Sequence, residues 1–394
     1  MPNPIRWLQR VRKGMPRPFL LLLLTTFLGD LGMGIQAASY PNFMVEQLQI
    51  QPGQLGVLES IRELPGFILV GIAALTMRVA EPVLASVALL VESLGMFSVY
   101  FVGSVEALIA VSFCWSLGFH TYHPLNQSMA LALAEEDQRG KRLGQLRSAT
   151  ALAQLIGMGS VGLIAALLGL RALFIIAGVS ILLAAVTVYR IPRDLRQVEK
   201  PRVVVKRRYS LYYALIFLEG CRRQVFATFA VYALVQVYHA SIFQISALMI
   251  GVNVANLILA PVIGHWIDRF GERRILTFYY VCLVPLFVGN ATVSTLPVLF
   301  ALYAADGVLM TLSLALTTYV DRIAEQRDVM PTLVMGVTMN HLAAVIVPVS
   351  GGLLWASYGY QMFFLLGAGV VVISLFATQR LPHVWPSKVT TTVS

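Results

Sequence analysis

Long apolar runs, each ending at charged or turn-forming residues, recur along the whole chain. Each run has about the 20 residues that an α-helix needs to cross the hydrocarbon core of a bilayer. The runs are continuous, whereas the strands of a membrane β-barrel read as short alternating segments, so the pattern excludes a barrel. The runs predict twelve membrane-spanning helices at residues 18–40, 53–77, 80–102, 105–132, 143–168, 170–189, 210–237, 242–266, 274–292, 295–320, 331–356 and 359–379.

The composition excludes a large soluble domain. Hydrophobic residues make up 58% of the chain and charged residues 12%, against about 45–50% and 25% in soluble domains. A soluble fold of 394 residues would need a polar shell that this chain lacks. Residues 19–28 after a basic start could be taken for a signal peptide, but the apolar run is too long and contains Asp30. We therefore predict an all-α integral membrane protein.

The positive charges lie on one side of the predicted helices. The net charge of +10 could indicate nucleic-acid binding, but 25 of the 29 Lys and Arg residues fall in the two terminal segments, in the central stretch 190–208 and in loops on that same side. Positive residues concentrate in cytoplasmic loops of membrane proteins. Both termini are therefore expected in the cytoplasm of a cell-membrane protein, and no nucleic-acid partner is needed to explain the charge.

The second half of the chain repeats the first at an offset of 190 residues. Gln54 maps to Gln244, and Gly169 maps to Gly359, in one ungapped register. Because six helices are an even number, the two copies share one orientation. The expected organisation is a basic segment at 1–17, a six-helix bundle at 18–190, a basic linker at 191–208, a second bundle at 209–380 and a tail at 381–394.

The stretch GHWIDRFGERR between the helices at 242–266 and 274–292 resembles a loop signature of the major facilitator superfamily, G-x-x-x-D-R-x-G-R-R. Glu272 replaces the first basic residue after the glycine. Gly264 would permit close helix approach, and Gly271 would allow a tight turn. The resemblance implies a cytoplasmic latch between the two halves, and the alternative is a plain positive hairpin. The latch residues would be Gly264, Asp268, Arg269, Gly271, Arg273 and Arg274.

Two shorter stretches carry a similar resemblance. PVSGG at 348–352 is similar to a close-packing segment of the superfamily, and YHPLNQS at 122–128 looks like the corresponding helix end of fosmidomycin-resistance-type members. The resemblance implies that the first, fourth, seventh and tenth helices line a substrate cavity and that the third helix of each half faces lipid. Glu92 on the helix at 80–102 does not fit this division. It either meets a neighbour such as Arg62 or marks a wrong lipid-facing assignment.

Ionisable residues lie inside the cavity-lining helices. A charge at the bilayer centre costs about 3 kcal/mol on insertion scales, so each such residue needs a partner or water. From the rise of 1.5 Å per residue in an α-helix, Asp30, Glu219 and Asp306 are predicted to lie near the middle of the membrane. The candidate substrate or proton pathway consists of Asp30, His120, His123, Glu219, Arg222, Arg223 and Asp306.

Glu219 and Arg223 are spaced i, i+4 on the helix at 210–237 and are expected to form an ion pair. Arg222 would then be a surplus guanidinium able to capture a carboxylate or phosphate. The alternative is a structural ion pair with no ligand.

Three interpretations compete for His120 and His123, which are spaced i, i+3: a proton relay, neutral hydrogen-bonded packing, or a metal site. No third ligand is evident from the sequence, so no metal is predicted. The residues Glu59, Arg62 and Glu63 share one face near the outer end of their helix. They form either an external gate or a self-neutralising cluster.

Together these features predict a secondary transporter that works by alternating access. The expected cargo is a small organic solute, anionic or zwitterionic rather than cationic, with protons as the coupling ion. The chain has no phosphate-binding glycine loop, and we expect neither enzyme activity nor a cofactor. The expected protein is a monomer whose partners are its substrate, protons and lipid. The alternatives are a multidrug-type proton-coupled exporter and a non-transporting membrane receptor or scaffold.

Overall fold

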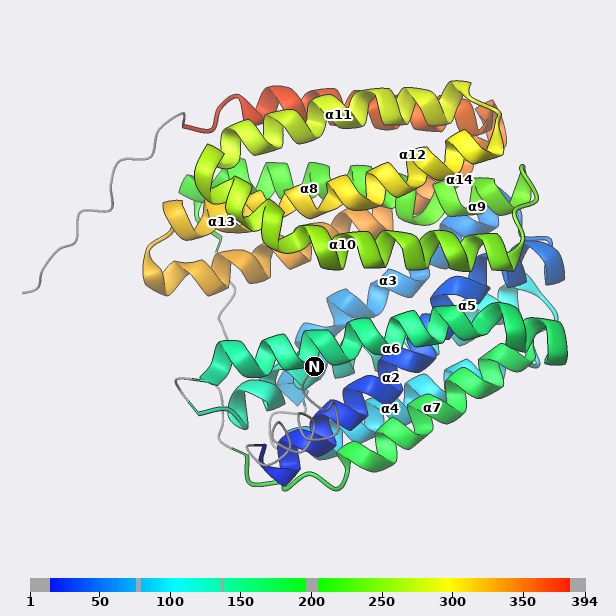
Figure 1. The fold of residues 1–394 in the computed structure, drawn as a ribbon, viewed down its shortest axis with the longest axis vertical. Coiled ribbons are helices and arrows are strands. Elements are labelled where there is room, and N and C mark those ends of the chain that lie inside the picture. Colours follow the sequence, from blue (N-terminus) through cyan, green and yellow to red (C-terminus); the bar gives the residue numbers. More distant parts are fainter. Residues whose placement is uncertain (1–14, 76–78, 136–137, 196–204, 383–394) are drawn as a thin grey trace, which may run out of the picture. The chain divides into compact units, whose positions relative to one another are not determined.

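The computed structural model describes residues 15–75, 79–135, 138–195 and 205–382. Much of the predicted basic segment 1–17, linker 191–208 and tail 381–394 lies outside these residues. The described residues are helical, with no strand among them. They fall into two compact units (Figure 1). The first unit comprises Met1–Ile50, Ile61–Lys200 and Ser241–Ile250, and the second comprises Gln51–Ser60, Pro201–Ala240 and Gly251–Ser394.

The first unit is built on α2 (Arg17–Asn42), which runs on into the π-helix η1 (Phe43–Gln47). α2 packs against α6 and α7, and α4 packs against α5 and α7. The other helices after η1 are α3 (Pro52–Leu75), α4 (Glu81–Val99), α5 (Val105–Ala132), α6 (Arg139–Leu168) and α7 (Ala172–Val188).

The second unit begins with the 3-10 turn η3 (Arg207–Tyr209) and α8 (Ser210–Gln224). In this unit α14 packs against α8 and α11. Two predicted spans are each divided into three pieces: the π-helix η4 (Val225–Ala230) lies between α8 and α9 (Val231–Gln236), and the 3-10 turn η5 (Met310–Ser313) lies between α12 (Leu296–Leu309) and α13 (Leu314–Ile323). The remaining helices are α11 (Glu272–Thr292), α14 (Gln326–Thr378) and α10 (Ile242–Phe270), of which the residues up to Ile250 belong to the first unit.

Among the described residues, seven helices are long and apolar enough to cross a membrane. They are Arg17–Gln47, Glu81–Val99, Arg139–Leu168, Ile242–Phe270, Glu272–Thr292, Leu296–Ile323 and Arg327–Thr378. The last of these merges two predicted spans across a non-helical residue, Gly359. Twelve spans and cytoplasmic termini therefore stay predictions.

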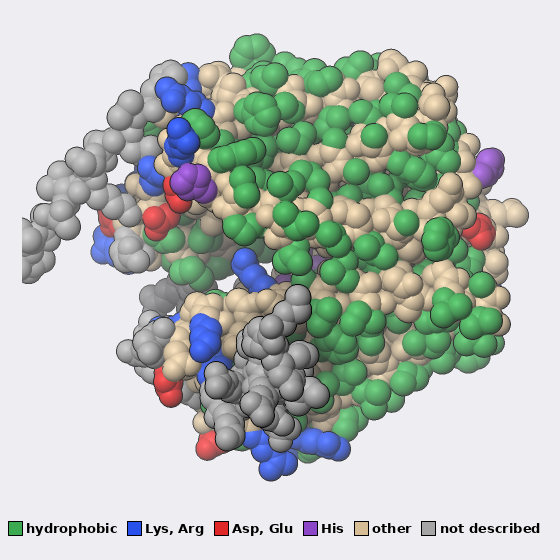
Figure 2. All heavy atoms as spheres, in the orientation of Figure 1, with side chains coloured by type: hydrophobic (Ala, Val, Ile, Leu, Met, Phe, Trp, Pro, Cys, Tyr) green, Lys and Arg blue, Asp and Glu red, His purple; other side chains and the backbone are tan. Residues whose placement is uncertain are grey.

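The helices expose apolar side chains along their middles. Leu257 is 60% exposed and Ile258 is 66% exposed on α10, and Phe278 is 53% exposed on α11. Figure 2 shows this apolar surface over the second unit, with Lys and Arg side chains gathered at the left end, where α10 passes into α11. An exposed apolar band with charges at the helix ends is the surface expected of a protein immersed in lipid.

The 190-residue repeat is visible in the local backbone. Gly169 has φ 81° and ψ 164°, and Gly359 has φ 82° and ψ 165°, so each ends a helix in a conformation that glycine adopts without strain. Gln54 and Gln244 also match, because their side-chain Oε1 atoms each accept a hydrogen bond over 2.9 Å from the backbone N–H three residues earlier. The predicted offset is confirmed at these positions.

Small residues let α14 approach the first turns of α3, which belong to the same unit. The backbone carbonyl of Pro348 lies against Gly56, and that of Pro52 lies against Gly352. A Cβ atom at either glycine would overlap the facing backbone. The prediction that PVSGG is a close-packing segment is confirmed.

Candidate functional site

Arg222 is the centre of a buried charge cluster in the second unit. Its side chain is completely buried and donates hydrogen bonds from Nη2 to Glu219 over 2.7 Å and from Nη1 to Asp306 over 2.6 Å. The hydroxyl groups of Tyr279 and Tyr280 donate to the two oxygens of Glu219, over 2.8 and 3.3 Å. The cluster joins α8, α11 and α12, and the charged groups of Arg222, Glu219 and Asp306 find their partners within this unit.

The predicted pairing of Glu219 with Arg223 is therefore wrong. Glu219 pairs with Arg222, three residues along the helix. Helical spacing permits both i, i+3 and i, i+4 pairs, and the burial of Asp306 on α12 decides between them because only Arg222 reaches both carboxylates. Arg222 is accordingly not a surplus cation.

Arg223 has the surroundings that were predicted for Arg222. Its side chain is partly exposed, and within the described ranges it has no hydrogen bond or ion pair. Ala227, one turn further along the same face, is exposed. Gly220, one turn earlier, packs tightly against Asn340 and Ala343 of α14, because a Cβ there would come within 2.8 Å of the Asn340 side chain.

Asp30 is the central acidic residue of the first unit. Its carboxylate accepts hydrogen bonds from Thr150 Oγ1 over 2.6 Å and from Gln154 Nε2 over 3.3 Å, both on α6. α2 and α6 come close here because Gly34 lies against the backbone of Gln154. The sequence placed Asp30 inside a helix but gave no sign of its partners, since Thr150 and Gln154 are ordinary polar residues more than a hundred positions away.

The two histidines on α5 have different surroundings. His120 is held at Nδ1 by Ser116, whose carbonyl oxygen is 2.9 Å away, and its Nε2 lies 3.7 Å from Glu63. His123 is exposed and its ring stacks on Phe119 at a centroid distance of 5.7 Å. Both rings contact Phe119, since the His120 ring lies edge-on to it at a centroid distance of 5.4 Å. The choice among proton relay, packing and a metal site stays open.

The predicted group on α3 divides between the two compact units. Glu59 belongs to the second unit and is buried, whereas Arg62 and Glu63 belong to the first. Arg62 lies 3.7 Å from Glu63 and over the ring of Trp115, and its backbone carbonyl accepts a hydrogen bond from Ser116. A gate role for these residues stays a prediction.

The latch sequence adopts only part of its expected geometry. Gly271 has φ 78°, as the predicted tight turn requires. Gly264 does not serve close packing in the described structure, because a Cβ there would meet no atom within 4 Å. Asp268, Arg269 and Arg274 are exposed.

Glu272, the residue that departs from the family signature, is fully buried and lies 2.6 Å from Arg322 at the end of α13. Arg273 donates to the backbone carbonyl of Leu381 and to Gln379. The loop therefore fastens α11 to neighbouring helices of its own unit, which the sequence did not predict.

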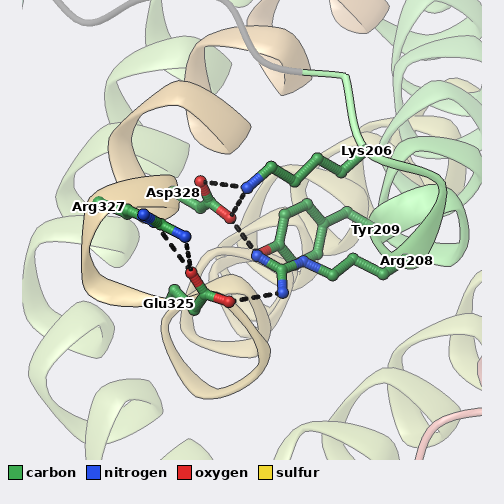
Figure 3. A network of polar contacts seen from close by, with 6 residues as sticks. All are labelled: Lys206, Arg208, Tyr209, Glu325, Arg327 and Asp328. Atoms are coloured by element: carbon green, nitrogen blue, oxygen red, sulfur yellow. Dashed lines mark hydrogen bonds and ion pairs between the residues drawn. The ribbon is translucent and has the colours of Figure 1, made fainter.

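A second ion network lies at the start of α14, and the sequence missed it entirely (Figure 3). The carboxylate of Asp328 accepts hydrogen bonds from Lys206 Nζ over 2.7 Å, from Tyr209 Oη over 2.8 Å and from Arg208. Arg208 also donates to Glu325 over 2.7 Å. Sequence reasoning counted Lys206 and Arg208 only as loop charges, because no helical spacing relates them to acids about 120 residues away.

These contacts shift the titration of the network, whose residues precede the apolar runs predicted at 210–237 and 331–356. The hydrogen bonds from Lys206 and Tyr209 hold the pKa of Asp328 well below its usual range. Arg208 lowers the pKa of Glu325, and in return Glu325 and Asp328 raise the pKa of Arg208. All three groups therefore stay charged across the physiological pH range.

Comparison with known proteins gives a family and a fold. The family model described as Major Facilitator Superfamily matches residues 22–216 and 212–391. The multidrug resistance protein MdtG of Escherichia coli is 28% identical over 258 residues, which cover 60% of this chain and 62% of that relative. The match thus spans less than two thirds of the relative's length.

Solved transporters share the fold. The structure of the nucleoside transporter NupG superposes with a TM-score of 0.77 at 14% identity, over 92% of this chain and 98% of NupG. A bacterial homolog of the human lysosomal transporter Spinster superposes with a TM-score of 0.73 at 11% identity, over 92% and 96%. At identities this low, the superpositions show that the architecture is shared, but they do not indicate which substrate this chain binds.

Proposed function

The chain belongs to the major facilitator superfamily, and from this premise we propose that it is a secondary active transporter of the cell membrane that moves a small organic anion or zwitterion by alternating access, coupled to protons. The family and the fold indicate a multi-pass membrane transporter rather than an enzyme. The substrate class and the proton coupling are our proposals. We also propose that the protein acts as a monomer with both termini in the cytoplasm.

The main support for an anionic substrate is the position of Arg223. A guanidinium cannot face acyl chains at mid-membrane depth without a large desolvation cost. Arg223 is partly exposed and has no ionic partner in the described part of the chain. It must therefore border water or a ligand, and its planar donors suit a carboxylate or phosphate.

The Arg222 cluster supports proton coupling. It contains two buried carboxyl groups, Glu219 and Asp306, and one guanidinium. Full ionisation would leave one buried negative charge in excess, which is costly in a dry interior. Glu219 accepts hydrogen bonds from Arg222, Tyr279 and Tyr280, whereas among the described residues Asp306 accepts from Arg222 alone. Asp306 is therefore the better place for an exchangeable proton.

A multidrug-type exporter is the second candidate, favoured by the match to MdtG. MdtG is a multidrug resistance protein, and this chain shares 28% identity with part of it. A multidrug exporter would tolerate lipophilic cations or neutral compounds, for which Arg223 would be no anchor. The two candidates thus differ in what the loss of Arg223 does.

The test is flux in proteoliposomes with an imposed pH gradient, using a mixture of labelled mono- and dicarboxylates, organic phosphates, zwitterions and lipophilic cations. Arg223→Ala should reduce anion flux by about tenfold or more, since a hydrogen bond to a charged group contributes about 1.5–3 kcal/mol. Arg380→Ala is the matched control, because Arg380 is an exposed cation at the end of the last helix. Undiminished anion flux in Arg223→Ala would show that Arg223 does not bind the substrate anion.

Two other results would redirect the proposal. Flux restricted to lipophilic cations and insensitive to Arg223→Ala would support the multidrug exporter. No flux of any solute above that of empty vesicles would favour a receptor or scaffold built on the same fold.

A further inference from the structure

Glu92 is a buried carboxyl group that the proposed transport sites do not use. Only 1% of the residue is exposed. On α4 the exposed face carries Val87, Leu90 and Leu94, the last being 57% exposed. Glu92 lies on the opposite, buried face, so the expected lipid-facing position of this helix does not extend to Glu92.

The position of Glu92 is fixed by close contact between three helices of the first unit. A Cβ on Gly118 of α5 would come within 2.7 Å of the Glu92 Cβ, so the two backbones touch. A Cβ on Gly29 of α2 would lie 3.9 Å from Leu89, one turn before Glu92, and 4.0 Å from the ring of Tyr122. Asp30, the residue after Gly29, is near enough for its carboxyl group to interact electrostatically with that of Glu92.

A buried carboxylate that is ionised needs hydrogen-bond donors or a positive partner, and Glu92 is poorly supplied with both. Its Oε2 atom has no hydrogen-bond partner among the described residues. In contrast, Asp30 accepts from Thr150 and Gln154. The interaction with Arg62 that the sequence allowed is not formed, since Arg62 has Glu63 as its acidic neighbour.

The groups around Glu92 do not supply a positive charge either. Helix α2 contributes Asp30, α5 contributes Tyr122, His120 and His123, and α7 has no ionisable side chain between Ala172 and Val188. The ordinary state of a histidine at neutral pH is uncharged. Burial and a neighbouring carboxylate both favour the protonated acid.

We propose that Glu92 is a proton-binding site of the first unit, occupied while the residue is buried as in this structure and emptied when the site opens to water. Its ligand is one proton, taken from water by the carboxylate oxygen and returned to water on release. The proposal deepens the proposed function, because it places a coupling proton on a helix outside the expected cavity lining. Occupancy itself is measured without any transported solute.

The direct test is infrared spectroscopy of the purified full-length protein in detergent, titrated from acidic to alkaline pH in light and heavy water. A protonated carboxyl group gives a carbonyl stretch that shifts on deuteration. This band should be present at neutral pH in the wild type and in Asp30→Asn, and the part due to Glu92 should be lost in Glu92→Gln. A wild-type band that is unchanged in Glu92→Gln would overturn the proposal.

Thermal stability distinguishes a neutral acid from an ionised one. Gln has the shape of the protonated acid, so Glu92→Gln should keep the melting temperature within about 2 °C of the wild type. The matched control is Glu219→Gln, which removes an ion-pair partner of Arg222 and should lower the melting temperature by more than about 5 °C. Equal destabilisation by both substitutions would show that Glu92 is ionised and paired.

Transport then tests the coupling. In proteoliposomes loaded with the labelled solute mixture, Glu92→Gln should abolish accumulation driven by a pH gradient but keep exchange at equal pH. Gradient-driven accumulation at the wild-type rate would overturn the coupling role. If the wild type itself moves no solute, the proposed function fails while the infrared result still decides the proton site.

Discussion

Arg222 Nη1 donates a hydrogen bond to Asp306 Oδ1 over 2.6 Å and thereby ties α8 to α12 inside the second unit. The same guanidinium binds Glu219 on its own helix. Its donors are thus directed at two carboxyl groups, and its side chain is fully buried. This geometry makes Arg222 a structural element of the second unit, and we propose Arg223 as the cation that binds a ligand.

Arg222→Ala should destabilise the protein strongly. It leaves Glu219 and Asp306 buried without a cation, and removing one partner of a buried pair costs about 3–5 kcal/mol. Arg223→Ala should leave stability within about 0.5 kcal/mol, since partly exposed positions without partners contribute little. Thermal unfolding in detergent measures both. Equal stability of the two variants would contradict the assignment of the ion pairs.

Thr150→Val should shift the pH at which Asp30 titrates while the Asp30 side chain itself stays in place. Val keeps the shape of Thr but loses the hydroxyl that donates to Asp30 over 2.6 Å. A carboxylate that loses a donor holds its proton more tightly, so the pH at which gradient-driven flux is half-maximal should rise. Thr121→Val is the control, because the Thr121 hydroxyl donates only to the carbonyl of Leu117 on its own helix. A pH profile that Thr150→Val leaves unmoved would separate Asp30 from the coupling step.

Asp328→Asn should destabilise the protein at neutral pH and lose this effect in acid. The pKa of Asp328 is lowered in the folded protein, chiefly by Lys206, so its stabilising contribution is complete above the unfolded value of about 4. The contribution disappears as the pH falls through the pKa that Asp328 has in the folded protein. Melting temperatures of the wild type and the variant should therefore differ at pH 7, and the difference should shrink progressively as the pH falls below about 4. A difference that persists in acid would mean that the charge of Asp328 is not what stabilises the network.

Glu272→Gln should affect stability more than Asp268→Asn does, although Asp268 is the residue that matches the family signature. Glu272 is fully buried against Arg322, whereas Asp268 is exposed. The expected costs are about 2–4 kcal/mol for the buried partner and less than about 0.5 kcal/mol for the exposed residue. If Asp268 acts as a latch, its substitution should instead change the labelling of a cysteine placed near Pro52. A larger loss of stability in Asp268→Asn would reverse this assignment.

Membrane topology is tested by single cysteines placed near Lys200 and near Pro52. The distribution of positive charge predicts that the first is labelled from the cytoplasm and the second from outside. Labelling of both from the same side would contradict the even number of helices in each half. The backbone match between Gly169 and Gly359 would then need another explanation.

The sequence determined the features that depend on local periodicity and composition. Apolar runs of bilayer length gave the helical membrane fold, because no other continuous apolar structure satisfies its backbone hydrogen bonds in lipid. The 190-residue offset is repeated in the conformations of Gly169 and Gly359, since a positive φ is a local property that glycine supplies. The turn at Gly271 follows from the same reasoning.

The tertiary structure alone decided which polar groups are partners. Glu219 could pair with Arg222 or Arg223 at equally suitable helical spacing, and only the position of Asp306 on a distant helix selected Arg222. In the same way, Thr150 became a ligand of Asp30, Lys206 a ligand of Asp328, and Glu272 a partner of Arg322. Periodicity fixes which face of a helix a side chain occupies, but ion pairing in a dry interior depends on distances between helices, and those are set by packing.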